Sequence, residues 1–304
     1  MANAETGRAE TAEEFGELMG KMFGPAPGAE RLRPYEPRPT DIIITPYGKC
    51  GTTWLQQTFH QLRTGGDMDF DDISRVVPWI ETAPSLGLDI NAEQKAEPRG
   101  FKSHLAYDAL PDGARYVVSL RNPKDAFVSM FRFMEGWFIE PGTVPMAHFY
   151  EGWITPGPQG SNYWDHLLSW WRQRDSADVL LLTYEHMIEA PKHHVQMLAD
   201  FCGIRLDEDL LALTLERSSL AYMLDHKDKF ADPMMRALSE ERCGFAPGSD
   251  SAKVRKGVVG GHETELPPEI GAAIDAAWAH HVEPEAGFAD YAALDAEIRR
   301  RNTP

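Results

Sequence analysis

Short apolar runs alternate along the chain with polar turns and with helical periodicity. Residues 42–44 (Ile-Ile-Ile), 114–120 and 179–185 are rich in β-branched and aliphatic side chains, which predicts buried strands. Apolar side chains recur at helical spacing after the first two runs, at Leu55, Phe59 and Leu62 and at Phe127, Val128, Met130 and Phe131. This order of elements favours an α/β fold with a parallel sheet flanked by helices.

The remaining segments divide into helical patterns and irregular stretches. Helices are predicted over residues 161–174, much of 191–224 and 270–281. Residues 67–99 are polar, acidic and spotted with proline, which predicts a long excursion over the surface. Residues 225–252 carry charge, proline, glycine and serine and are interpreted as a flexible loop or lid.

The N-terminal 40 residues differ in character from the rest of the chain. They begin with small and acidic residues and end in a proline-rich stretch, Pro34-Tyr35-Glu36-Pro37-Arg38-Pro39. Prolines block a regular element just before the first strand, so residues 1–40 are predicted to be a mobile arm. Within this arm lies one possible amphipathic helix, with Phe15, Leu18, Met19, Met22 and Phe23 on it. Residues 41–304 are predicted to form a single α/β domain.

Charge and composition restrict the partners. The chain has 47 Asp and Glu against 30 Lys and Arg, a formal net charge of −17, which disfavours nucleic acid and anionic membranes. The apolar runs are too short for a membrane span and the acidic N-terminus is unlike a signal peptide, so we expect a cytoplasmic protein. Cys50, Cys202 and Cys243 are widely spaced and predict neither a disulfide framework nor a zinc site.

The segment from Asp41 to Leu62 combines strand, loop and helix in a way that suits an anion. Glycines in the loop Tyr47-Gly48-Lys49-Cys50-Gly51 allow a tight turn, and the helix that starts at Thr52-Thr53 presents unpaired N–H groups. Lys49 adds a cation. The usual nucleotide-binding loop has its lysine after the second glycine, whereas Lys49 precedes Gly51, so an ATPase or GTPase is a poor match.

The sequence Y-G-K-C-G-T-T-W at residues 47–54 resembles the Y-P-K-S-G-T-T-W loop of sulfotransferases that use 3′-phosphoadenosine 5′-phosphosulfate (PAPS). The resemblance implies that Lys49 stabilises the leaving phosphate and that Trp54 stacks on adenine. It assigns the rest of the loop, Cys50, Gly51, Thr52 and Thr53, to the 5′-phosphosulfate end. Cys50 stands where the family usually has serine, a residue thought there to restrain premature cofactor hydrolysis, and Gly48 stands where it usually has proline.

Two further motifs follow in the family's order. Lys102-Ser103-His104-Leu105 resembles the K-T-H-L element, which implies that His104 is the catalytic base and that Lys102 assists at the phosphosulfate. Imidazole suits this task because its unperturbed pKa is about 6.5. Arg121-Asn122-Pro123-Lys124-Asp125 with Ser129 resembles the segment R-N-P-K-D-x-x-x-S, which implies that Arg121 and Ser129 hold the 3′-phosphate of the cofactor.

Weaker matches complete the set. Tyr184-Glu185-His186 resembles the family's Y-E-D, and Ser218-Ser219-Leu220 resembles T-S-F, so Tyr184 and Ser219 are assigned to the adenine. Arg255-Lys256-Gly257 with Gly260 resembles R-K-G-x-x-G, which in the family closes over the 3′-phosphate. Residues 261–266 depart from the family's continuation, and the usual dimer motif is not recognisable there, so the oligomeric state stays open.

The resemblance spans roughly residues 41–260 and implies a P-loop-like three-layer fold with a central parallel sheet. It also implies in-line transfer of a sulfuryl group from PAPS to a hydroxyl or amine, without a metal, leaving adenosine 3′,5′-bisphosphate. A P-loop kinase or NTPase and a non-catalytic nucleotide-binding protein remain as alternatives. The aromatic cluster from Phe131 to Phe138 suggests an apolar or aromatic small-molecule or lipid-like acceptor.

Overall fold

The computed structural model describes residues 3–24, 34–154, 161–248, 257 and 259–303. Within these residues one sheet of four parallel strands forms the centre of the molecule, in the order β2-β1-β3-β4. The strands are β1 (Ile42–Ile44), β2 (Gly100–Lys102), β3 (Arg115–Leu120) and β4 (Val179–Thr183). Ile44 lies opposite Lys102 on one side and Val117 on the other, so β1 sits where the strand order changes direction. In parallel sheets such a point opens a crevice for ligands.

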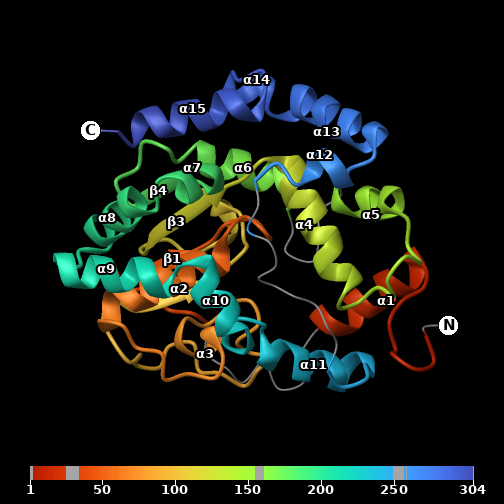
Figure 1. Ribbon diagram of the computed structural model, residues 1–304, viewed down its shortest axis with the longest axis horizontal. Coiled ribbons are helices and arrows are strands. Elements are labelled where there is room, and N and C mark those ends of the chain that lie inside the picture. The colour runs from red at the N-terminus through yellow and green to blue at the C-terminus, as the bar shows by residue number, and fades with distance from the viewer. Residues whose placement is uncertain (1–2, 25–33, 155–160, 249–256, 258, 304) are drawn as a thin grey trace.

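Helices cover both faces of the sheet (Figure 1). Alternate side chains of one strand point to opposite faces, so Ile43 joins the core cluster of one face while Ile42 and Ile44 join that of the other. The first face packs against α4 (Pro123–Glu135), α6 (Tyr163–Trp171), α13 (Pro268–His281) and α15 (Tyr291–Arg301). The second packs against α2 (Thr52–Thr64), α3 (Ile73–Val76) and α8 (Pro191–Cys202). The predicted three-layer α/β fold with a parallel sheet is confirmed.

Further elements complete the described chain. They are α1 (Ala12–Phe23), α5 (Met146–Trp153), α7 (Tyr184–Glu189), α9 (Glu208–Arg217), α10 (Leu220–Asp225), α11 (Pro233–Cys243), α12 (His262–Glu265) and α14 (Glu283–Ala286), with 3₁₀ turns at Tyr107–Ala109 and Lys227–Lys229. None of the helices in this part of the chain is long and apolar enough to cross a membrane.

The predicted elements and the observed ones differ mainly in two places. β2 was not predicted, because three residues give too short a pattern to distinguish a strand from a turn. The stretch 225–252, interpreted as a loop or lid, contains the eleven-residue helix α11 in its described part. Met235 and Leu238 of α11 are buried against α1, a contact between distant segments that no local pattern reveals.

The N-terminal segment contains the predicted amphipathic helix, α1. Leu18 and Met22 are buried against α11, and Ala9 forms a parallel bridge with Ile139. The Thr6 hydroxyl also donates a hydrogen bond to Glu140, with an oxygen–oxygen distance of 2.9 Å. Residues 3–24 therefore pack on the body of the protein beside the end of α4, while the division of the chain at residue 40 stays a prediction.

Candidate active site

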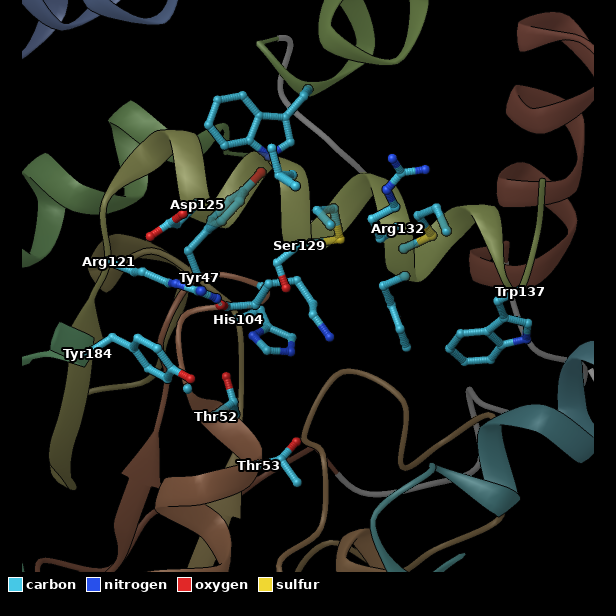
Figure 2. Close-up of a pocket in the computed structure, with 18 of the residues that line it drawn as sticks. Tyr47, Thr52, Thr53, His104, Arg121, Asp125, Ser129, Arg132, Trp137 and Tyr184 are labelled. Carbon is cyan, nitrogen blue, oxygen red and sulfur yellow. Dashed lines mark hydrogen bonds between the residues drawn. The ribbon is translucent and has the colours of Figure 1, made fainter. Parts of the chain in front are cut away.

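The predicted site residues come together at one edge of the sheet. Because all four strands are parallel, their carboxyl ends meet at the same edge, where Lys49 follows β1, His104 follows β2, Arg121 follows β3 and Tyr184 follows β4. These residues border a cavity of about 1220 Å³ (Figure 2). A cavity of this size exceeds the usual range for one small molecule, so it has room for a cofactor and an acceptor together.

Most of the predicted residues line this cavity. They are Lys49, Gly51, Thr52, Thr53, Trp54, Lys102, His104, Arg121, Ser129, Tyr184, Ser219 and Gly257. Cys50 is not among the lining residues, because its side chain packs into the core cluster on one face of the sheet. Arg255 and Lys256 lie outside the described residues.

The loop after β1 contains two residues with positive φ. Lys49 adopts a φ of 68° and Gly51 a φ of 98°, both in the left-handed region. A β-carbon on Gly51 would lie 2.9 Å from Cδ2 of Tyr184, so glycine allows the loop to pack closely against the residue that follows β4. The Ser119 hydroxyl donates a hydrogen bond to the Cys50 carbonyl, which ties the same loop to β3.

Arg121 links three strand ends. Its Nη1 donates to the carbonyl of Lys49 at 2.9 Å, and its guanidinium carbon lies 4.3 Å from the centre of the Tyr184 ring. The Tyr163 hydroxyl donates to the Arg121 carbonyl and so fixes the backbone where the arginine side chain begins. A guanidinium held in this way is oriented before any anion arrives, which reduces the entropy lost on binding.

Two lysines bring positive charge to the cavity, and each lies over an aromatic ring. Nζ of Lys49 is 4.2 Å from the centre of the Phe133 ring, and Nζ of Lys102 is 3.8 Å from the centre of the Trp79 ring. Lys102 is only 1 % exposed. Charge held in a site with little water acts strongly on an anion, because the local dielectric is low.

His104 is held in one orientation by contacts on both its backbone and its ring. Nδ1 lies 2.7 Å from the carbonyl oxygen of Pro46, and the backbone N–H donates to Oε1 of Glu81 at 2.8 Å. A carbonyl oxygen only accepts, so the proton of the neutral ring is assigned to Nδ1 and the basic lone pair to Nε2. The Trp79 ring packs edge-on at 5.2 Å between centroids. This arrangement is suited to a general base that acts through Nε2.

Trp54, Ser219 and Tyr184 also border the cavity. Nε1 of Trp54 donates to the carbonyl of Ser218 at 2.6 Å, so the indole is fixed against the segment before α10. The Ser219 hydroxyl accepts from the N–H of Tyr222 and thereby caps α10. Ser219 is therefore already used as a helix cap, while Trp54 and Tyr184 supply ring surface to the cavity.

The start of α2 offers donors to an anion. Among the described residues, the buried Thr52 hydroxyl has no hydrogen-bond partner. Gly51 caps α2 without a side-chain hydrogen bond, so the first N–H groups of this helix receive no side-chain acceptor from their cap. A phosphate or phosphosulfate group would supply acceptors for such groups, and the helix dipole favours its negative charge.

Cys50 contributes to the loop from its buried side. Its Sγ lies 3.8 Å from the carbonyl oxygen of Gly48, and burial raises the pKa of the thiol to about 12. The thiol is therefore protonated at neutral pH and only weakly hydrogen-bonded.

Replacing Cys50 by serine tests this substitution of the family's residue. We expect Cys50→Ser to keep sulfuryl transfer but to change the rate at which PAPS is hydrolysed without acceptor, because a hydroxyl is a stronger donor than a thiol inside the same loop. The measurement is release of sulfate from labelled PAPS in the two proteins. Identical rates of hydrolysis would contradict this role for position 50.

His166 packs against the start of the loop after β1, and the burial of its ring should make the stability of the protein depend on pH. Its Nε2 lies 3.0 Å from the carbonyl oxygen of Thr45, its ring packs against Tyr47, and burial lowers its pKa to about 3. The unfolded chain binds this proton near pH 6.5, so stability falls as the pH drops from 6.5 towards 3, by up to about 1.4 kcal/mol per pH unit. His166→Gln keeps a donor near the Nε2 position, so urea unfolding of this variant should depend less steeply on pH than that of the parent. Equal slopes would contradict the prediction.

Apart from the residues that follow the strands, the cavity is lined by apolar side chains. They come from α1, from α4 and the residues after it, and from α5: Phe15, Met19, Phe23, Met130, Phe133, Met134, Trp137, Phe138, Phe149 and Trp153. The predicted aromatic cluster from Phe131 to Phe138 therefore contributes to the cavity, although Phe131 itself is core.

Three features of the site escaped sequence reasoning. Trp79 was not assigned to the site, but its ring packs on both Lys102 and His104. Glu81 was not singled out, although it accepts the backbone N–H of His104. α1 was not connected with the site, because its place beside the cavity depends on packing between segments far apart in sequence.

Comparisons with known proteins identify the family of this chain. The sulfotransferase domain family matches residues 39–284. Dog sulfotransferase 1B1 is 31 % identical over 209 residues, covering 65 % of this chain and 70 % of the relative, and human sulfotransferase 1C2 is 28 % identical over 259 residues, covering 80 % and 84 %. The chain belongs to the sulfotransferase domain family. This confirms the predicted reaction class, an enzyme that transfers a sulfuryl group, and favours it over a kinase or NTPase.

Two solved structures share the fold. A mouse sulfotransferase, SULT7A1, complexed with PAP has a TM-score of 0.62 at 21 % identity, and the match covers 94 % of each chain. Retinol dehydratase in a complex with retinol and PAP has a TM-score of 0.65 at 18 % identity, covering 89 % of this chain and 94 % of the other. At these identities the likeness supports the architecture alone.

Proposed function

We propose that the chain transfers a sulfuryl group from PAPS to a hydroxyl or amine of a small-molecule acceptor. The acceptor oxygen or nitrogen attacks sulfur while Nε2 of His104 takes its proton. The bond between sulfur and the bridging phosphate oxygen breaks, and Lys49 stabilises the charge that develops on that oxygen, assisted by Lys102. Adenosine 3′,5′-bisphosphate leaves.

One observation supports this proposal most directly: His104, Lys49 and Lys102 border the same cavity from neighbouring strands β1 and β2. Ile44 and Lys102 are register partners, which places the two loops that follow them side by side. A base and two cations that are brought together at one point can act on the two ends of a single in-line displacement.

The remaining residues are proposed to hold the cofactor. Thr52, Thr53 and the N–H groups at the start of α2 bind the 5′-phosphosulfate, and Trp54 and Tyr184 contact the adenine. Arg121 and Ser129 hold the 3′-phosphate, with Arg255, Lys256 and Gly257 as further predicted ligands. PAPS fits the donor set, because Lys49 and Lys102 supply positive charge and the start of α2 supplies hydroxyl and N–H donors to the same cavity.

The acceptor is proposed to be apolar or aromatic. The apolar lining of the cavity is built from the side chains of α1, α4 and α5 described above, among which Phe133, Trp137 and Phe138 supply broad ring surface. The predicted cytoplasmic location stays part of this proposal.

The direct experiment incubates the protein with labelled PAPS and a panel of phenols, aliphatic alcohols and amines. We expect label to move to at least one apolar member of the panel. Calorimetry with adenosine 3′,5′-bisphosphate and with ATP plus Mg²⁺ separates the proposal from a kinase. Tight binding of the bisphosphate without transfer to any acceptor would instead support a non-catalytic nucleotide-binding protein.

A further inference from the structure

A short segment packs along α4 next to the proposed 3′-phosphate site. This segment, residues 259–265, includes α12, which lies beside α4 in Figure 1. Oδ2 of Asp125 accepts the N–H of Gly260 at 2.8 Å, and Oδ1 accepts both the backbone N–H of His262 at 3.0 Å and its ring Nδ1 at 2.8 Å. Three donors from one segment therefore converge on one carboxylate, which is 3 % exposed.

A second contact holds the other end of the segment. Nε of Arg132 lies 2.9 Å from Oε2 of Glu265, and Nη1 of Arg132 lies 2.6 Å from Oε2 of Glu135. Asp125, Ser129 and Arg132 are spaced by four and three residues along α4, so they share one face of the helix. Ser129 therefore lies between the two points at which α12 is attached.

The charge of Asp125 is the reason why these contacts matter. Burial would raise the pKa of Asp125, but the hydrogen bonds from Gly260 and His262 and the nearby charge of Arg121 lower it overall. The carboxylate is thus ionised beside a site proposed for a phosphate. The negative charges of the carboxylate and of the phosphate repel each other. Hydrogen bonds from N–H donors to the carboxylate stabilise its negative charge.

We propose that His262 and Glu265 are positioning residues for the 3′-phosphate. His262 donates a hydrogen bond to the Asp125 carboxylate and keeps it turned towards residues 260–262, while Glu265 holds Arg132 in place. The phosphate then meets the donors of Ser129 and Arg121 and not an exposed negative charge. The inference rests on the proposed function, which assigns Arg121 and Ser129 to that phosphate. Its residues lie in the segment 261–266, where this chain departs from the family's pattern.

The test compares two nucleotides that differ only in the 3′-phosphate. Dissociation constants for adenosine 3′,5′-bisphosphate and adenosine 5′-monophosphate are measured by calorimetry. We expect His262→Ala to weaken the bisphosphate about tenfold, as for loss of a hydrogen bond to a charged group, and the monophosphate less than about twofold. Glu265→Gln should have the same selectivity with a smaller effect, about threefold, because the pair with Arg132 is partly exposed.

Matched variants separate positioning from general damage. His262→Asn places an amide N–H near the position of Nδ1 and should retain parental affinity, whereas His262→Gln places it near Nε2 and should behave like alanine. His280→Ala, at an exposed position in α13, should leave both constants unchanged. If His262→Ala fails to fold, the Asn and Gln pair decides the question alone.

Four outcomes count against the inference. Equal weakening of both nucleotides in His262→Ala would show a merely structural role, and unchanged affinity for the bisphosphate would show none. A parent protein that binds neither nucleotide would overturn the proposed function itself, and with it this inference. A parent that binds the bisphosphate tightly while the Asn and Gln variants behave alike would overturn the inference only.

Discussion

Replacing His104 by asparagine should lower the rate of sulfuryl transfer by about 10²- to 10⁴-fold, the range typical for loss of a general base. Asparagine can place a side-chain N–H near the position of Nδ1 and so keep the hydrogen bond to the Pro46 carbonyl, which is 2.7 Å from Nδ1 in the parent. It has no basic atom at the position of Nε2. The measurement is kcat with saturating PAPS and the best acceptor of the panel.

Binding and rescue distinguish chemistry from misfolding in this variant. The affinity of His104→Asn for adenosine 3′,5′-bisphosphate should equal that of the parent, because the proposed cofactor ligands lie on other loops. The defect should also shrink at high pH with a phenol as acceptor, since a phenol ionises near pH 10 and then needs no base. Parental turnover at neutral pH would refute the role of His104.

Replacing Lys49 by methionine should lower transfer by about 10²- to 10³-fold, comparable to loss of one charge-stabilising donor in other active sites. Methionine keeps an unbranched side chain that can lie over the Phe133 ring, where Nζ is now 4.2 Å from the ring centre, so mainly the charge is lost. Both residues must adopt the positive φ of position 49, so the backbone strain is the same. The measurement is again kcat, together with the dissociation constant of the bisphosphate.

A second lysine nearby provides a control for Lys49→Met. Lys124 is in the first turn of α4, but its Nζ is paired with Asp275 at 2.8 Å, and it does not line the cavity. Lys124→Met should therefore retain close to parental activity. If both variants lose the same activity, the effect would reflect the general potential of the site, and the specific role of Lys49 would be wrong.

The sequence predicted the parts of the site that depend on local pattern. Strands β1, β3 and β4 could be predicted because three or more consecutive apolar residues end at a polar turn in each. The proposed catalytic and binding residues follow these strands. Once the strands are known to be parallel, their carboxyl ends meet, which is why Lys49, Arg121 and Tyr184 could be grouped without coordinates. β2 was missed as a strand, although His104 after it was found through its motif.

Contacts between distant segments could not be predicted in this way. The sequence named His104 but did not show which ring nitrogen is basic, because that depends on the Pro46 carbonyl 58 residues earlier. It named Asp125 as part of the motif after the second predicted strand but gave no sign of its contact with His262, 137 residues later. Neither pairing has a local signature, since hydrogen bonds across the fold leave no periodicity.

By itself, then, the sequence determined strands β1, β3 and β4, the family, and the residue types that meet at the edge of the sheet. These follow from short-range periodicity and from motifs whose spacing is fixed by single turns. Tertiary structure alone decided the burial of Cys50, the tautomer of His104 and the place of α1 in the cavity wall. These depend on which distant surfaces bury apolar area and satisfy hydrogen bonds together, a property of the whole packed chain.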